Sequence, residues 1–156
     1  MIDESEVQRI RPAAAAGGKP VELHLVSVCT RERGQHVVDG VVIGDPVPEL
    51  FVWDESPWDC AVWGDEKDAE LLEHALRIIS NGSFPPHGRR DGLSEGHWHQ
   101  LRDAMVFEAH VRSGNEFFAT KDKKGFISNG KREALEQLGR TRIVEPGDLE
   151  TELMKS

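Results

Sequence analysis

The sequence has little cysteine, no long apolar run and no excess of basic residues. Its two cysteines, Cys29 and Cys60, form no Cys-x-x-Cys pair, so zinc-ribbon and thioredoxin-like chemistry have no support. No apolar stretch approaches the roughly 18 residues of a membrane-spanning helix. The first twenty residues also lack the apolar core of a signal peptide. We therefore expect a cytoplasmic protein with no membrane partner.

Acidic residues outnumber basic ones, 28 against 19, and the formal net charge is -9. Broad electrostatic binding of nucleic acid needs clustered Lys and Arg, so this balance argues against it. A metal-dependent nuclease is still compatible with it, because a carboxylate site is negative until its cation binds and the bound cation then attracts phosphate. The 38% apolar content and the length of 156 residues fit one globular domain with a small extension.

Composition divides the chain into three parts. Residues 1–19 include an alanine run that leads into two glycines, and we predict a flexible tail there. Residues 20–48 contain two β-like runs around a polar loop, which predicts a β-hairpin extension. Residues 49–156 are expected to form the main domain.

Helices and strands are predicted to alternate in the main domain. N-capping residues followed by apolar side chains at helical spacing predict helices after Asp65 and Ser94. Short apolar runs at 116–120 and 142–144 predict strands, each followed by a helix. This order favours an α/β fold with a parallel sheet flanked by helices, in which ligands bind at the carboxyl ends of the strands. The apolar stripes of the first two helices are Leu72, Ala75, Leu76, Ile79, Leu101, Ala104, Met105, Ala109 and Val111.

Two aspartates are expected at one edge of this sheet. Asp103 lies on the second helix, and Asp122 follows the strand at 116–120. A helix rises about 1.5 Å per residue and a strand about 3.3 Å, so the path from Asp103 to Gly114 and the return to Thr120 cover roughly 16 and 20 Å. The two carboxylates should therefore reach the same level. Such a pair suits Mg²⁺ or Mn²⁺, which take oxygen ligands and keep waters for chemistry.

The stretch LRDAMVFEAHVRSGNEFFATKDKKGFI, followed by GKREALEQLGRTRIVEPGDLETEL, resembles the C-terminal half of a PIN domain. The resemblance covers residues 97–153. Its features are an acidic helix residue, Asp103, ahead of an apolar stripe ending in Ala109, and a strand that ends in Thr-x-Asp at Asp122. A last strand then leads into a turn that contains Pro146. We therefore expect a PIN-like domain.

Two acidic positions of the family match this sequence less closely. The first Asp of a PIN domain ends its opening strand, and Asp54 is the best match. The second acidic residue is normally a Glu on an intervening helix, where Glu73 and Glu95 are the candidates. Because no clear counterpart stands at this position, a catalytically inactive PIN-like module that binds RNA or a partner protein is the alternative reading. A plain interaction domain is the third.

The resemblance implies a metal-dependent endoribonuclease that hydrolyses phosphodiester bonds in single-stranded RNA. Asp54, Asp103 and Asp122 would be its catalytic residues and its ligands to Mg²⁺ or Mn²⁺. Thr120 would hydrogen-bond a carboxylate or the phosphate. The lysines beside Asp122, namely Lys121, Lys123 and Lys124, would contact the RNA backbone. Many small PIN proteins are toxins held in check by an antitoxin, so an antitoxin-like or other protein partner and a homodimer are also considered.

Three histidines raise a zinc hypothesis. His97 and His99 are two residues apart, so on a helix they point about 200° apart and cannot face one ion. His110 lies three turns farther on. We therefore predict that all three are surface histidines and not zinc ligands.

Overall fold

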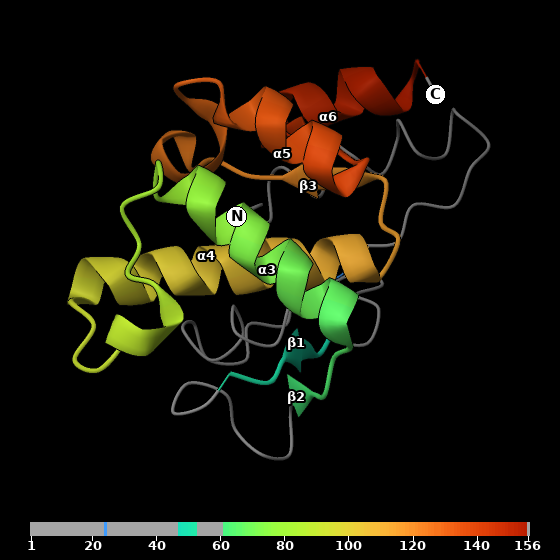
Figure 1. Cartoon of the computed structure of the whole chain (residues 1–156). Coiled ribbons are helices and arrows are strands. Elements are labelled where there is room, and N and C mark those ends of the chain that lie inside the picture. Colours follow the sequence, from blue (N-terminus) through green and yellow to red (C-terminus); the bar gives the residue numbers. More distant parts are fainter. Residues whose placement is uncertain (1–23, 25–46, 53–60, 156) are drawn as a thin grey trace.

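The computed structural model describes residue 24, residues 47–52 and residues 61–155. The predicted flexible tail, almost all of the predicted hairpin and Asp54 lie outside the described residues. The described part is a mixed α/β structure, mostly helical, with two small parallel sheets (Figure 1). No helix within these ranges is both long enough and apolar enough to cross a membrane.

Ten elements follow one another along the described chain, including a short 3-10 turn, η1, and a π-helical turn, η2, that the sequence did not predict. They are β1 (Glu49–Leu50), β2 (Ala61–Val62), α3 (Glu66–Ile79), η1 (His87–Arg89), α4 (Glu95–Arg112), β3 (Phe117–Ala119), η2 (Lys123–Ile127), α5 (Lys131–Gly139), β4 (Arg142–Val144) and α6 (Pro146–Leu153).

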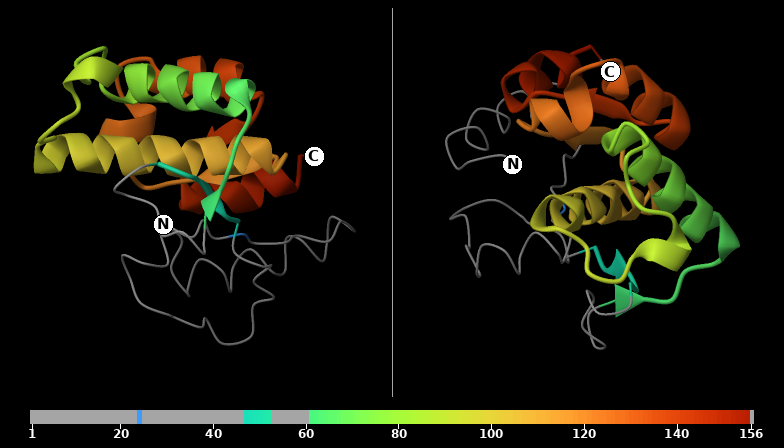
Figure 2. Two further views of the ribbon diagram at one scale, coloured as in Figure 1. Left: turned by 60° about the horizontal axis from the view of Figure 1, so that its bottom comes forward. Right: turned by 60° about the vertical axis from the view of Figure 1, so that its left-hand side comes forward.

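The predicted parallel pairing is present in the C-terminal half, where β3 pairs with β4 and Phe118 lies opposite Ile143. However, the described residues form two separate two-stranded sheets and not one larger sheet. Figures 1 and 2 show the spatial reason, because α4 lies between the β1–β2 pair on one side and the β3–β4 pair on the other. The helix therefore covers a face of each short sheet.

The starts of the two long helices are confirmed by their caps. The Asp65 side chain accepts hydrogen bonds from the amides of Lys67 and Asp68, and the Asp68 side chain accepts from the Asp65 amide, which completes a capping box. Ser94 accepts from the His97 amide at the start of α4. These bonds satisfy amides that have no partner inside a helix.

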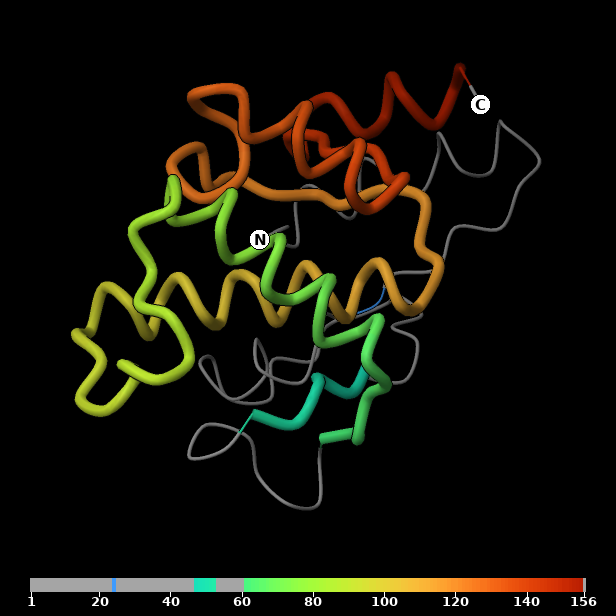
Figure 3. The backbone as a smooth tube through the Cα atoms, in the orientation of Figure 1, coloured from blue at the N-terminus to red at the C-terminus, as the bar shows by residue number. Residues whose placement is uncertain are grey.

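The predicted apolar stripes form the core where α3 packs along α4 (Figure 2). Eight of the nine stripe residues are buried, and Val111 is half-buried. Phe107 of α4, Leu135 of α5 and Ile143 of β4 complete this core and are also fully enclosed. The trace in Figure 3 shows how the chain then leaves α4, returns through β3 and reaches η2.

Arg112 connects the far end of α4 to the segment that enters β1. Its Nε donates to Glu108 Oε1 at 2.8 Å, and its terminal nitrogen donates to the Pro48 carbonyl at 2.6 Å. Glu108 is fully buried, and burial raises the pKa of its carboxyl although Arg112 opposes this effect.

The prediction of a surface position is wrong for His110, which is 6% exposed. His110 is buried because tertiary packing places Phe118 of β3 against its imidazole ring, with 5.0 Å between ring centroids. The ring Nε2 lies 2.7 Å from the hydroxyl of Thr141. Since that hydroxyl donates to the Glu116 carbonyl, it accepts from the imidazole, which fixes the neutral Nε2–H form.

We expect His110 to make the protein sensitive to mild acid. Burial lowers the pKa of His110 from 6.5 to about 4, so the unfolded chain binds a proton here before the folded chain does. The neutral, buried His110 therefore contributes to the stability of the folded protein above the pKa that it has in the unfolded chain. This contribution is lost as the pH falls toward 4. Between pH 7 and pH 5 it amounts to about 2 kcal/mol. In urea unfolding at the two pH values, His110→Gln, which keeps a donor nitrogen, should lose correspondingly less stability than the wild type.

The comparison variant is His99→Gln, on the exposed side of the same helix, and it should keep the acid sensitivity of the wild type. Equal acid sensitivity of His110→Gln and the wild type would contradict the prediction.

Candidate metal centre

Asp122 is held in place by hydrogen bonds on both its backbone and its side chain. Its amide donates to the Thr120 hydroxyl at 3.1 Å, and its carbonyl accepts from the Phe126 amide at 3.2 Å. Its Oδ1 accepts from the Gly125 amide at 2.9 Å, which caps η2. The backbone before it is fixed in turn, because the Thr120 amide donates to the Val144 carbonyl and continues the β3–β4 ladder. The Asp122 carboxylate is thus exposed but oriented.

Asp103 and Asp122 meet at Gly125. A β-carbon placed on this buried glycine would lie 2.5 Å from Asp122 Oδ2 and 3.3 Å from Asp103 Oδ2. Both oxygens therefore lie close to one point, the position that a β-carbon of residue 125 would occupy, and so they lie close to each other. The expectation that helix descent and strand return bring the two carboxylates to one level is met, because a side chain at Gly125 would contact oxygens of both.

The chemistry of this pair suits a hard divalent cation. Mg²⁺ is usually held by one or two carboxylates and keeps several waters or substrate phosphate oxygens as its other ligands. Within the described ranges, no three Asp, Glu, His or Cys side chains are grouped closely enough to form a metal cluster. Among those residues the pair is therefore the whole carboxylate set at this point, and the predicted third ligand, Asp54, is outside them.

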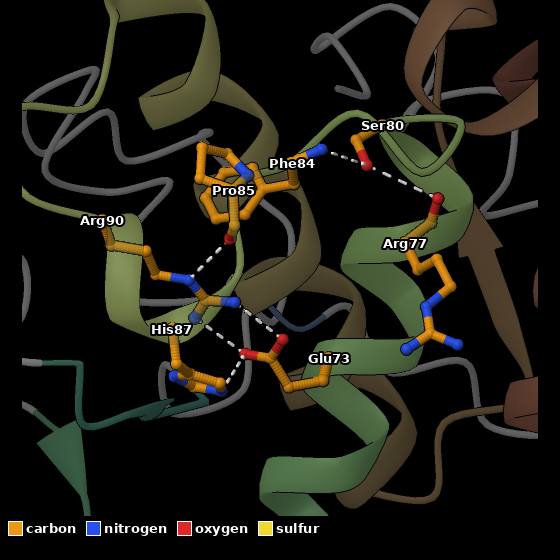
Figure 4. Close-up of polar contacts among 7 residues, drawn as sticks. All are labelled: Glu73, Arg77, Ser80, Phe84, Pro85, His87 and Arg90. Carbon is orange, nitrogen blue, oxygen red and sulfur yellow. Dashed lines mark hydrogen bonds and ion pairs between the residues drawn. The ribbon is translucent and has the colours of Figure 1, made fainter.

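Glu73, one candidate for the second acidic residue, is engaged elsewhere. Arg90 donates to both of its carboxylate oxygens at 2.8 Å, and His87 Nε2 lies 3.0 Å from Oε1 (Figure 4). Burial acts to raise the pKa of Glu73, but the hydrogen bonds and charge of Arg90 outweigh it, and the pKa lies below its usual value. Arg90 also donates to the Pro85 carbonyl, so this cluster fastens the loop after α3 to that helix. The other candidate, Glu95, is an exposed residue in the first turn of α4.

The residues predicted to bind substrate surround Asp122. Thr120 is buried, and its hydroxyl accepts a hydrogen bond from the Asp122 amide. The hydroxyl therefore helps to fix the backbone at Asp122. Lys121 and Lys123 are exposed beside the pair. Lys123 also forms an ion pair with Glu145 at 3.5 Å.

Glu145 is a further acidic residue near the aspartate pair, and it is not among the predicted site residues. It directly follows β4, so it lies at the same sheet edge as Asp122, since parallel strands end at a common edge. Its position directly after the second predicted strand is the sequence feature that could have indicated a carboxylate at this edge. Arg132 lies 4.0 Å from this carboxylate, which therefore faces two cations.

No protein-family model, curated protein or solved structure matches this chain significantly.

The close fit at Gly125 predicts a selective cost for adding a methyl group. Gly125→Ala would place its β-carbon against Asp122 Oδ2, and turning the carboxylate away would break its hydrogen bond to the amide. We expect the free energy of unfolding, measured with urea in the absence of metal, to fall by about 1 kcal/mol. The hydrogen bond that breaks is to a charged group, but Asp122 is exposed, so the cost stays small. The matched control is Gly147→Ala in α6, where the added β-carbon meets nothing within 4 Å. An equal effect of the two substitutions would show that the fit at Gly125 is unimportant.

Proposed function

We propose that this protein is a PIN-like, metal-dependent endoribonuclease that hydrolyses phosphodiester bonds in single-stranded RNA. The observation that carries the proposal is the convergence of Asp103 Oδ2 and Asp122 Oδ2 on the side-chain-free face of Gly125. The two aspartates come from different elements, α4 and the β3–η2 junction, which the chain turn after α4 brings together. Two carboxylates brought this close suit a divalent cation, whose charge would offset their mutual repulsion.

In this proposal the protein's own groups bind and orient the reactants. Asp103 and Asp122 would hold Mg²⁺ or Mn²⁺, and Asp54 would be a further ligand. The bound ion would polarise the phosphate and lower the pKa of the attacking water. The exposed ammonium groups of Lys121 and Lys123 would contact the phosphates on either side of the bond that breaks.

The alternative is a catalytically inactive PIN-like module that binds RNA or a partner protein. One observation favours it: Glu73 and Glu95, the two candidates for the family's second acidic residue, do not join the aspartate pair among the described residues. Both readings share the fold and the aspartate pair, and they differ in whether RNA is cut.

Metal binding should appear first as stabilisation. A ligand that binds only the folded state raises the unfolding free energy by about 2.7 kcal/mol when its free concentration is one hundred times the dissociation constant. The melting temperature should therefore rise steadily as Mn²⁺ is added. Asp103→Asn and Asp122→Asn should each abolish this rise, whereas Asp91→Asn, an exposed loop aspartate, should retain it. A melting temperature that is insensitive to Mn²⁺ and Mg²⁺ would leave the proposed metal centre without support.

Catalysis is tested separately with a mixed pool of single-stranded RNA. The wild type should cut the pool only in the presence of Mg²⁺ or Mn²⁺. Asp103→Asn and Asp122→Asn should reduce the rate by about a hundredfold or more, because losing a metal ligand should cost no less than the roughly 10- to 100-fold typical of losing a group that only supports one. Asp91→Asn should cut as the wild type does. Stabilisation by Mn²⁺ without any cleavage would favour the inactive module.

A further inference from the structure

Lys131 is a charged residue in the interior, only 5% exposed at the start of α5. Its Nζ donates to the Ile79 carbonyl at 2.5 Å and to the Lys124 carbonyl at 2.7 Å. The first of these bonds caps α3, because Ile79 is the last residue of that helix and its carbonyl has no partner inside it. The second bond reaches into η2, the turn that follows Asp122.

The carbonyl that Lys131 holds belongs to the same peptide group as the amide that holds Asp122. The Lys124 carbonyl and the Gly125 N–H are the two polar ends of one planar trans unit, so they point in opposite directions and turn together. One end accepts from the Lys131 ammonium, and the other donates to Asp122 Oδ1 at 2.9 Å. A single rigid peptide therefore connects a buried cation to the carboxylate of the candidate metal centre.

We propose that Lys131 is a positioning residue for this centre, which aims the Gly125 amide at Asp122 Oδ1 and so leaves Oδ2 turned toward Asp103. This inference rests on the proposed function for its consequence, metal binding, but the positioning itself is a property of the metal-free protein. Without Lys131 the 124–125 peptide has no buried anchor. It then turns, and Asp122 loses the bond that selects its orientation.

The competing electrostatic effect has the opposite sign. Burial lowers the pKa of Lys131, and the nearby charges of Asp122 and Asp103 oppose this shift, so the ammonium group acts electrically on the same two aspartates. If Lys131 were only a counter-charge, removing it would make the centre more negative and strengthen cation binding. If it positions Asp122, removing it weakens cation binding. The sign of the change therefore separates the two roles.

The test compares Lys131→Met, of similar length but neutral, with Leu135→Ala, which removes a fully buried side chain one turn farther along α5. In the metal-free protein, hydrogen exchange of the Gly125 amide is measured by NMR relative to the β3 amides. We expect it to be at least about tenfold faster in Lys131→Met and unchanged in Leu135→Ala. Titration calorimetry should show Mn²⁺ affinity about tenfold lower in Lys131→Met and within about threefold of wild type in Leu135→Ala.

Lys131→Arg, which keeps the charge and the donors, should restore most of both properties, and Lys131→Gln replaces Lys131→Met should the latter fail to fold. Unchanged Gly125 exchange, or a higher Mn²⁺ affinity in Lys131→Met, would overturn the proposal. A wild type that binds no Mn²⁺ would overturn the proposed function alone, and the exchange measurement would still decide whether Lys131 orients the peptide.

Discussion

The buried ammonium group of Lys131 joins three elements at one point, because its hydrogen bonds run from the start of α5 to the end of α3 and into η2. A buried charge is costly unless polar groups surround it, and here two carbonyls supply that partnership. Both carbonyls also obtain a hydrogen-bond partner that regular secondary structure does not give them, since one ends a helix and the other lies in an irregular turn. The Lys131 ammonium thus links η2, which directly follows Asp122, to the end of α3 and the start of α5.

Four acidic side chains of the described structure stand in two kinds of surroundings. Glu73 and Glu108 each accept a 2.8 Å hydrogen bond from an arginine that ties a neighbouring segment to their helix. Asp103 and Asp122 each bring an Oδ2 close to the side-chain-free face of Gly125. The arginine-bound glutamates tie segments to helices, whereas the two aspartates bring two carboxylates to one point beside Lys131. The proposed metal centre rests on this meeting of two carboxylates.

Local features of the chain were predictable where they depend on short stretches of sequence. Capping by Asp65 and Ser94 and the 3.6-residue spacing of apolar side chains depend on neighbours within a few positions, and both helices begin as predicted. The level of Asp103 and Asp122 also followed from residue counts, because the rise per residue of helix and strand is nearly constant. His110 was misplaced, since its burial depends on Phe118 and Thr141 from later strands and turns.

The amino-acid sequence by itself thus determined the order of elements from α3 to α6 apart from the turns η1 and η2, the N-caps of α3 and α4, the apolar stripes and the two aspartates that could share an edge. The tertiary structure decided that the described strands form two small sheets on either side of α4, that Glu73 is bound by Arg90, and that Lys131 anchors the peptide beside Asp122. The physical reason is range. Periodicity and capping act within a few residues, whereas a hydrogen bond between Lys131 and Ile79 joins positions that only the packed chain brings together.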